Sequence, residues 1–254
     1  MNFHSDEWIM NKMQSHYNDA CKKYPEYRIV GVFYQGSGNY GLDYEGSDVD
    51  TKCVLAPSLK ELAESKMTST TYVRENDEHI DFKDVRAMLE TFRKSNLNFL
   101  EILYTKYYII NPIYEAEWNK LIAARDSIVA MNLPSLLKSM KGIASEKFHA
   151  LEHNKLAKHM MHLVRLYLMC FDILNNGEIV TYREKDHDFL MEIRNGKYLD
   201  ENKQPIPEFF KLVDELEAKF DMAKETTSLP DNPDYKKINE FVASVNERVV
   251  KGQI

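Results

Sequence analysis

Cysteine is scarce in this chain, which has three (Cys21, Cys53 and Cys170) among 254 residues. An odd number of widely spaced cysteines forms neither a disulfide framework nor a zinc box, and it fits a reducing cytoplasm. Long apolar runs are also lacking, so we expect no transmembrane helix. The first residues do not show the basic-then-apolar pattern of a secretory signal, which again favours a cytoplasmic protein.

Positive charge is in deficit, because 33 Lys and Arg stand against 40 Asp and Glu, and the formal net charge is −7. An acidic total argues against a protein that coats nucleic acid non-specifically, although a local basic patch can still guide a phosphate-bearing ligand. Hydrophobic residues make up 44% of the chain. This fraction is typical of a globular protein and excludes a disordered one.

Local patterns predict an α+β unit followed by a helical unit. Apolar residues at helical spacing predict a helix at 5–23, which Ser5 can cap. Short β-branched or alternating runs predict strands at 28–34, 48–56, 70–74 and 79–82. Ser58 can cap a short helix at 59–64. Helical periodicity begins at Val85, and the break at 132–134 marks a domain boundary.

Glycine is sparse as well, yet three of the nine glycines lie between Gly36 and Gly41, directly after the strand predicted at 28–34. After a strand, a glycine lets the backbone approach a phosphate, while the Ser37 hydroxyl and nearby N–H groups can donate to its oxygens. A short helix predicted near 38–42 would add its N-terminal dipole. Gly36 and Ser37 are therefore candidate nucleotide-binding residues.

Asp48 and Asp50 lie at i and i+2 of the next predicted strand, so their carboxylates should share one face. At a separation of roughly 4 Å and an effective dielectric near 20, their repulsion is of order 4 kcal/mol. Protonation of one group or binding of a cation relieves such repulsion. Oxygen ligands completed by water suit Mg²⁺ better than a soft metal.

Each of these two features has a simpler interpretation. Gly36 and Ser37 can form an ordinary turn, and the two aspartates can cap the next element. For either feature alone the simpler interpretation is preferable. Both features occur in the correct order on consecutive predicted strands, and this combination favours phosphoryl-group chemistry.

The same residues resemble a known signature. Gly36-Ser37 followed by Asp48-Val49-Asp50 resembles that of the DNA-polymerase-beta-like nucleotidyltransferase superfamily. The fuller string at 36–42 and 46–50 resembles its prokaryotic and phage branch associated with RNA repair. Further blocks that resemble this branch lie at 96–101, 158–166, 177–178 and 193–196. The resemblance covers about residues 28–198.

The resemblance implies an α+β nucleotidyltransferase core with a mixed sheet at 24–130, preceded by an N-terminal helix at 1–23 and followed by a helical domain at 131–254. It also implies transfer of a nucleoside monophosphate from an NTP, with release of pyrophosphate. Two Mg²⁺ ions, or Mn²⁺ in their place, would be held by Asp48, Asp50 and a third carboxylate.

Asp81 is the best candidate for the third carboxylate. The apolar neighbours in Ile80-Asp81-Phe82 should face the core, which leaves Asp81 facing the site. The rivals are Asp77, Glu78 and Asp84, of which Asp84 opens a helical run and is better explained as its N-cap.

The segment 138–165 is locally basic, with six Lys or Arg against two Glu. Lys158, His162 and Arg165 lie on roughly the opposite face from its apolar residues. From periodicity alone, they form the solvated face of an amphipathic helix. The resemblance instead implies that they face the cleft and contact the triphosphate or an acceptor phosphate.

Other features have structural explanations. Histidines 149, 153, 159 and 162 lack the neighbours of a zinc site and are expected at the surface. Asn98 and Glu101 have the spacing of a capping box. Cys53 is expected to be a small buried residue.

Three functions stay open at this point. The first is transfer of a nucleotide to RNA, with tRNA included, and the second is nucleotidylation of a protein or a small molecule. The third is a non-catalytic nucleotide-binding module, which the Asp48–Asp50 pair disfavours. Because the chain is acidic, any contact with RNA should be short and concentrated on the 138–165 face.

Overall fold

The computed structural model describes residues 3–149 and 156–254. The described strands are β1 (Ile29–Gln35), β2 (Asp50–Leu55), β3 (Ser69–Val73), β4 (His79–Asp84) and β5 (Tyr108–Ile110). The helices of the first half are α1 (Asp6–Lys23), α2 (Leu59–Ala63), α3 (Val85–Arg93), α4 (Leu97–Leu100), α5 (Glu115–Ala123) and α6 (Arg125–Val129). Those of the second half are α7 (Leu133–His149), α8 (Leu156–Asn176), α9 (His187–Arg194), α10 (Pro207–Thr226) and α11 (Lys236–Val250).

The strands form one mixed sheet in the order β3-β4-β2-β1-β5. β2 and β4 run parallel, with Lys52 opposite Asp81, whereas the other neighbouring strands are antiparallel. Gln35 at the end of β1 lies opposite Asp50 at the start of β2. The predicted α+β class and mixed sheet are confirmed. The parallel pair brings Asp50 and Asp81 onto neighbouring strands.

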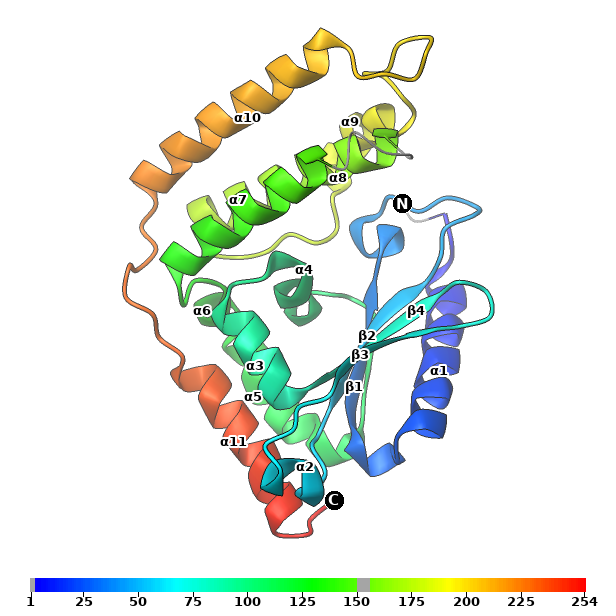
Figure 1. Ribbon diagram of the computed structural model, residues 1–254, viewed down its shortest axis with the longest axis vertical. Helices are drawn as coiled ribbons and strands as arrows, with labels where there is room; N and C mark the ends of the chain where they lie inside the picture. Colours follow the sequence, from blue (N-terminus) through cyan, green and yellow to red (C-terminus); the bar gives the residue numbers. More distant parts are fainter. Residues whose placement is uncertain (1–2, 150–155) are drawn as a thin grey trace.

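Helices cover both faces of this sheet (Figure 1). On one face, α1 buries apolar residues such as Ile9 and Met13 against Ile29, Val32 and the same face of β2 and β4. On the other face, α3, α5 and α11 share a core with Val30 and the helical second half. Helices α7 to α10 gather beyond one end of the sheet (Figure 1).

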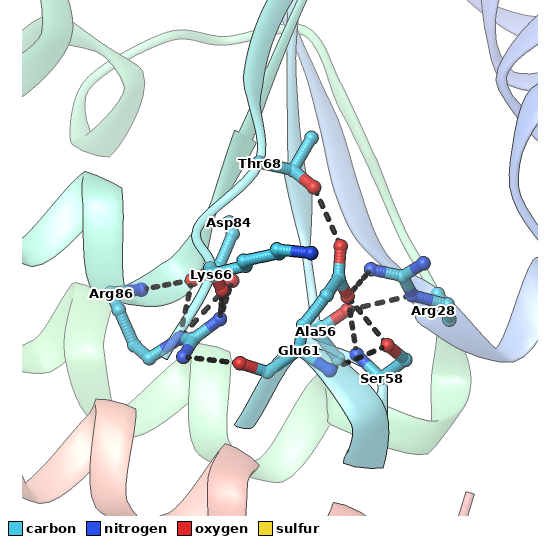
Figure 2. A network of polar contacts seen from close by, with 8 residues as sticks. All are labelled: Arg28, Ala56, Ser58, Glu61, Lys66, Thr68, Asp84 and Arg86. Carbon is cyan, nitrogen blue, oxygen red and sulfur yellow. Dashed lines mark hydrogen bonds and ion pairs between the residues drawn. The ribbon is translucent and has the colours of Figure 1, made fainter. Parts of the chain in front are cut away.

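Polar side chains fix the end of β2 and β4 that lies away from Asp50 (Figure 2). Ser58 caps α2 in a reciprocal capping box with Glu61, as the sequence predicts. Arg28 pairs with Glu61 and donates from Nε to the Ala56 carbonyl at 3.1 Å. Asp84 caps α3 and is held by Arg86, so its expected role as an N-cap is confirmed.

The last helix, α11, returns to the first half of the chain and packs on α5 and α3 (Figure 1). The connection that leads into α7 and the connection that leads into α11 meet at one place. There the Asp234 N–H donates to the Met131 carbonyl at 2.9 Å, and Asn132 Nδ2 donates to the Tyr235 hydroxyl oxygen at 2.6 Å. No helix of the described residues is long and apolar enough to cross a membrane.

Some local expectations need correction. β2 begins at Asp50, so Asp48 lies in the loop before the strand rather than within it. The helix expected near 38–42 is a single 3₁₀ turn at Ser37–Tyr40, too short to build up a helix dipole. β5 is not predicted, because three residues carry too little of the period-2 pattern. The division into parts at 1–23, 24–130 and 131–254 stays a prediction.

Candidate active site

A cavity of about 320 Å³ opens between the sheet and the second-half helices. We call it the carboxylate cavity. All the residues that the sequence nominates line it, namely Gly36, Ser37, Asp48, Asp50, Asp81, Lys158, His162 and Arg165. Residues from β1, β2, β4 and the loop before β2 therefore face residues from α8 across one space.

The sheet wall of the carboxylate cavity is acidic. Thr51 is hydrogen-bonded to His16 of α1, so Asp50 and Lys52 alternate to the opposite face of β2. Asp50 accepts the His79 backbone N–H at 2.9 Å. Burial raises the pKa of Asp50, the neighbouring Asp48 adds to the rise, and the Lys158 charge opposes it. Asp48 and Asp50 both line the cavity, even though only Asp50 is in the strand.

Asp81 extends this wall from the neighbouring strand. It lies on β4 opposite Lys52, which places its side chain on the same face of the sheet as Asp50. Its Oδ1 atom accepts the Thr71 hydroxyl at 2.5 Å. Asp81 therefore borders the cavity from β4, the strand next to β2 on the side away from β1.

The three rival carboxylates do not line this cavity. Asp84 is committed to capping α3, as Figure 2 shows. Glu78 is buried on the α1 side of the sheet, where it accepts hydrogen bonds from Lys12 at 2.8 Å and is bonded to His16 at 3.0 Å. Asp77 lies in the exposed turn between β3 and β4. Asp81 as the third carboxylate stays a prediction, with its position now known.

The turn after β1 has the backbone that its glycine allows. Gly36 has φ +105° and ψ −168°, a region that residues other than glycine rarely enter. The Ser37 hydroxyl donates to Ser47 Oγ at 3.0 Å, and Ser47 Oγ also accepts the Tyr44 N–H at 2.9 Å. These bonds close the loop that separates β1 from β2, and they hold Ser37 beside the cavity.

The opposite wall is basic and comes from α8 and α9. Lys158 and His162 line it as predicted, and Arg194 joins them from the end of α9. Arg194 donates to the Leu42 carbonyl at 3.0 Å and lies 4.5 Å from the centre of the Tyr44 ring. The sequence does not nominate Arg194 or Tyr44, although the block at 193–196 was a signal for Arg194.

Arg165 is not part of a solvated face, so the interpretation from periodicity is wrong for this residue. Its side chain is buried, with the guanidinium 3.7 Å from the centre of the Tyr40 ring. Arg165 Nη1 lies 4.0 Å from Glu101 Oε2 and donates to Met169 Sδ at 2.8 Å. Among the described residues, its Nε atom has no hydrogen-bond acceptor.

Glu101 is buried beneath the same cavity and is not half of a capping box. Asn96, rather than Asn98, occupies the N-cap position of α4. The Glu101 carboxylate accepts the Tyr40 hydroxyl at 2.9 Å and Gln35 Nε2 at 3.0 Å. Burial raises the pKa of Glu101, and the charges of Arg165 and Lys52 oppose this rise. A local spacing rule could not reveal these partners, because they come from other elements.

The described histidines of the 149–162 segment do not share one environment. His149 is exposed, as expected for a surface residue, while His159 is half-buried. His162 lines the carboxylate cavity. His153 lies outside the described residues. Cys53 is fully buried, as predicted.

The donors of the acidic wall suit a hard cation. Over the described part of the chain, no three or more His, Cys, Asp or Glu side chains gather closely enough to cage a metal ion. Mg²⁺ does not need such a cage, since it keeps several waters and binds through one or two carboxylates together with substrate phosphates. Asp48 and Asp50, which line the same cavity as the basic residues of α8 and α9, fit this mode.

With this geometry established, the chain can be compared with known proteins. It matches the model of the RNA repair pathway DNA polymerase beta family (RlaP) over residues 7–244. The chain belongs to this family. No curated protein matches it.

The RlaP match is wider than the resemblance found in the sequence, because it begins in α1 and ends in α11. The N-terminal helix and most of the last part of the chain are therefore family features too. Membership of a polymerase-beta-like family supports nucleotidyl transfer as the class of reaction. It also connects the chain with RNA repair.

Proposed function

We propose that this protein is a divalent-metal-dependent nucleotidyltransferase that moves a nucleoside monophosphate from an NTP to a hydroxyl group of RNA, tRNA included, with release of pyrophosphate. One observation carries the proposal. Three carboxylates, Asp48 in the loop before β2, Asp50 on β2 and Asp81 on β4, line a single cavity with Lys158, Arg194 and His162. A triphosphate with its cations fits between walls of opposite charge, because the cations face the acids and the phosphate oxygens face the bases.

The sheet wall would hold the cations. Divalent ions bound by Asp48, Asp50 and Asp81 would supply Lewis-acid stabilisation of the phosphoryl oxygens and favour the ionised acceptor hydroxyl. Asp81, on the next strand from Asp50, is the group we assign to the acceptor side. The acceptor oxygen then forms a bond to the α-phosphorus while the bond to the β-phosphate oxygen breaks and pyrophosphate leaves.

The remaining residues would bind and orient the nucleotide. The Gly36 turn lets phosphate oxygens approach the backbone, and the Ser37 hydroxyl would exchange its bond to Ser47 for a phosphate oxygen. Lys158 and Arg194 would contact the phosphates directly. Arg165 lies below them, where it adds positive charge and packs on Tyr40.

The test is the release of pyrophosphate from each NTP in the presence of Mg²⁺ and total RNA, with the labelled products separated into RNA and protein. We expect label in RNA, and we expect Asp48→Asn and Asp50→Asn to lower the rate by several orders of magnitude. Glu45→Gln is the matched control, since Glu45 is exposed in the same loop and does not line the cavity.

Two results would overturn the proposal. Release of pyrophosphate at the parent rate by both aspartate variants would remove the acidic wall from the reaction. Label that enters protein or a small molecule rather than RNA would leave the reaction class intact but replace the acceptor.

A further inference from the structure

A second cavity of about 320 Å³ adjoins the carboxylate cavity. We call it the β3–β4 cavity, because it lies over those strands and the segment from Thr91 to Phe99. The two cavities share two lining residues, Asp81 and Asn98. Asp81 is therefore the wall between them, and a molecule that reaches Asp81 from the β3–β4 cavity would meet the nucleotide there.

The lining of the β3–β4 cavity is suited to an anion. It is lined by two lysines, four hydroxyl residues and two amides, together with Asp81, Phe82 and Phe99: Lys52, Lys83, Ser69, Thr70, Thr71, Thr91, Asn96 and Asn98. Thr70 lies opposite Phe82, so these two residues contribute from strand positions whose side chains turn to the α1 face. Among the described residues that line it, Asp81 is the only acid. Lysine, hydroxyl and amide groups are the donors with which proteins bind nucleic-acid phosphates.

Strand pairing explains why these groups meet. Ser69 lies opposite Lys83 and Thr71 lies opposite Asp81 across the β3–β4 pair, so all four project from one face of the sheet. Lys52 comes to the same face from β2, opposite Asp81. On this face, the acidic Asp81 therefore has two basic neighbours: Lys52 opposite it on β2, and Lys83 two residues further along β4.

Both lysines are held in place. Lys83 Nζ donates to Ser69 Oγ at 3.2 Å. Lys52 is buried and donates to Gln35, which also bonds Glu101. Each ammonium group lies 5.4 Å from the centre of the Phe99 ring, so the two charges flank one ring. The cavity thus has a buried lysine at its floor and a half-exposed one at its edge, both with fixed side-chain partners.

We propose that the β3–β4 cavity binds the phosphodiester backbone of the acceptor RNA, next to its terminal hydroxyl, and that it delivers this hydroxyl to Asp81. The proposal rests on the proposed function, since it assigns the acceptor of the same reaction. The triphosphate has its own partners on the other side of Asp81, at the Gly36 turn and the α8–α9 wall. The chain carries a net charge of −7, so its contact with RNA must be local, as this small basic cavity is. This contact lies at the β3–β4 cavity instead of the 138–165 face that the sequence suggests.

The first test is direct binding, which does not require catalysis. A short fluorescent single-stranded oligoribonucleotide with a free terminal hydroxyl is titrated with the protein in Mg²⁺ and no NTP, at several salt concentrations. We expect Lys83→Gln to weaken binding roughly five- to tenfold, and to lower the slope of log K against log salt by about 0.7 for one lost phosphate contact on a single strand. Lys83→Arg should keep the parent slope.

Lys60→Gln is the matched control, because Lys60 is a lysine with an 80% exposed side chain on α2, outside both cavities. It should bind the oligoribonucleotide as the parent does. Ser69→Ala removes the hydroxyl that holds Lys83 and should weaken binding less than Lys83→Gln. Ser69 and Lys83 are both at least partly exposed, so neither variant should disturb folding.

The second test separates acceptor from nucleotide. In steady-state transfer, Lys83→Gln should raise the KM for the RNA about tenfold and leave the KM for the NTP unchanged. A raised KM for the NTP would assign the cavity to the triphosphate and overturn the proposal. Parent-like RNA binding and KM in Lys83→Gln would also overturn it, while the proposed transfer reaction would stand. Conversely, suppose that Lys83→Gln weakens RNA binding while the parent protein itself shows no transferase activity. That result would support the cavity as an RNA site and refute the reaction.

Discussion

The Arg165 guanidinium lies 3.7 Å from the centre of the Tyr40 ring, directly beside the buried carboxylate of Glu101. Tyr40 comes from the turn after β1, and Arg165 comes from the middle of α8. This contact joins the sheet to the second-half helices under the candidate active site. An arginine in such a place is needed because it balances a carboxylate that has little access to water.

We therefore expect Arg165→Met to lower the free energy of unfolding by about 3–5 kcal/mol, because it leaves the Glu101 charge buried without its partner. The double variant Arg165→Met, Glu101→Gln should recover part of that loss, since the uncompensated charge is gone. Urea unfolding of the parent, both single variants and the double variant gives the coupling. Strictly additive losses would show that the two side chains do not act on each other.

The Asp48–Asp50 pair predicts a conflict between stability and function. Without divalent cations, Asp50→Asn should raise the melting temperature by a few degrees, because it removes a charge that burial and Asp48 disfavour. Addition of Mg²⁺ should stabilise the parent and have little effect on Asp50→Asn. Thermal unfolding with and without Mg²⁺ measures both effects, with Glu45→Gln as the control. An equal response to Mg²⁺ in parent and Asp50→Asn would exclude Asp50 as a ligand.

The backbone of Gly36 gives a prediction that does not depend on contacts. A Cβ atom there would have open space, with the Asp48 carbonyl oxygen at 3.8 Å, yet φ is +105°. Gly36→Ala should therefore cost about 1–3 kcal/mol from backbone strain alone. Gly142→Ala is the opposite case, because Gly142 lies in α7 with nothing within 4 Å, and alanine should stabilise that helix by about 1 kcal/mol. Chemical denaturation of both variants measures their free energies of unfolding. A loss of stability in Gly36→Ala would show that backbone strain, rather than a steric clash, makes glycine necessary there.

Glu78 should make the protein sensitive to acid. Burial raises the pKa of Glu78, but hydrogen bonds from His16, Lys12 and Asn76 outweigh it, and the pKa lies well below its usual value. A carboxylate with a depressed pKa in the folded state stabilises the fold above its unfolded pKa of about 4.3 and loses this contribution as the pH falls. At pH values under about 4.5, the free energy of unfolding should therefore decrease as the pH falls. In Glu78→Gln this decrease should be smaller. An unchanged acid slope in Glu78→Gln would assign it to other groups.

Local sequence signals were sufficient where one element carries its own pattern. The helix capped by Ser5, the cap at Ser58 and the N-cap at Asp84 are confirmed, because a cap depends on residues within one turn. The Gly36 and Asp50 motifs were found for a similar reason, since each lies within a few residues of a strand end.

Residues whose partners come from distant elements could not be predicted in this way. The periodicity of α8 places Arg165 on the polar side, but the ring that covers it belongs to Tyr40. The spacing of Asn98 and Glu101 suggests a capping box, but Glu101 instead accepts hydrogen bonds from Tyr40 and Gln35. Lys52 and Lys83 had no motif at all, because they become neighbours only through the pairing of β2 with β4.

The hydrogen bond from the Asp234 N–H to the Met131 carbonyl has a consequence for how the two halves of the chain are joined. The chain leaves the sheet-containing half before α7 and returns to it before α11. The two connecting segments are hydrogen-bonded to each other beside Asn132. Helices α7 to α10 are thus held to the first half of the chain here and again at the cavity, where Arg165 packs on Tyr40 and Arg194 donates to the Leu42 carbonyl. The space above Asp50 is therefore bounded by helices that are tied to the sheet side at two places, one of them far along the sequence from the residues that line the carboxylate cavity.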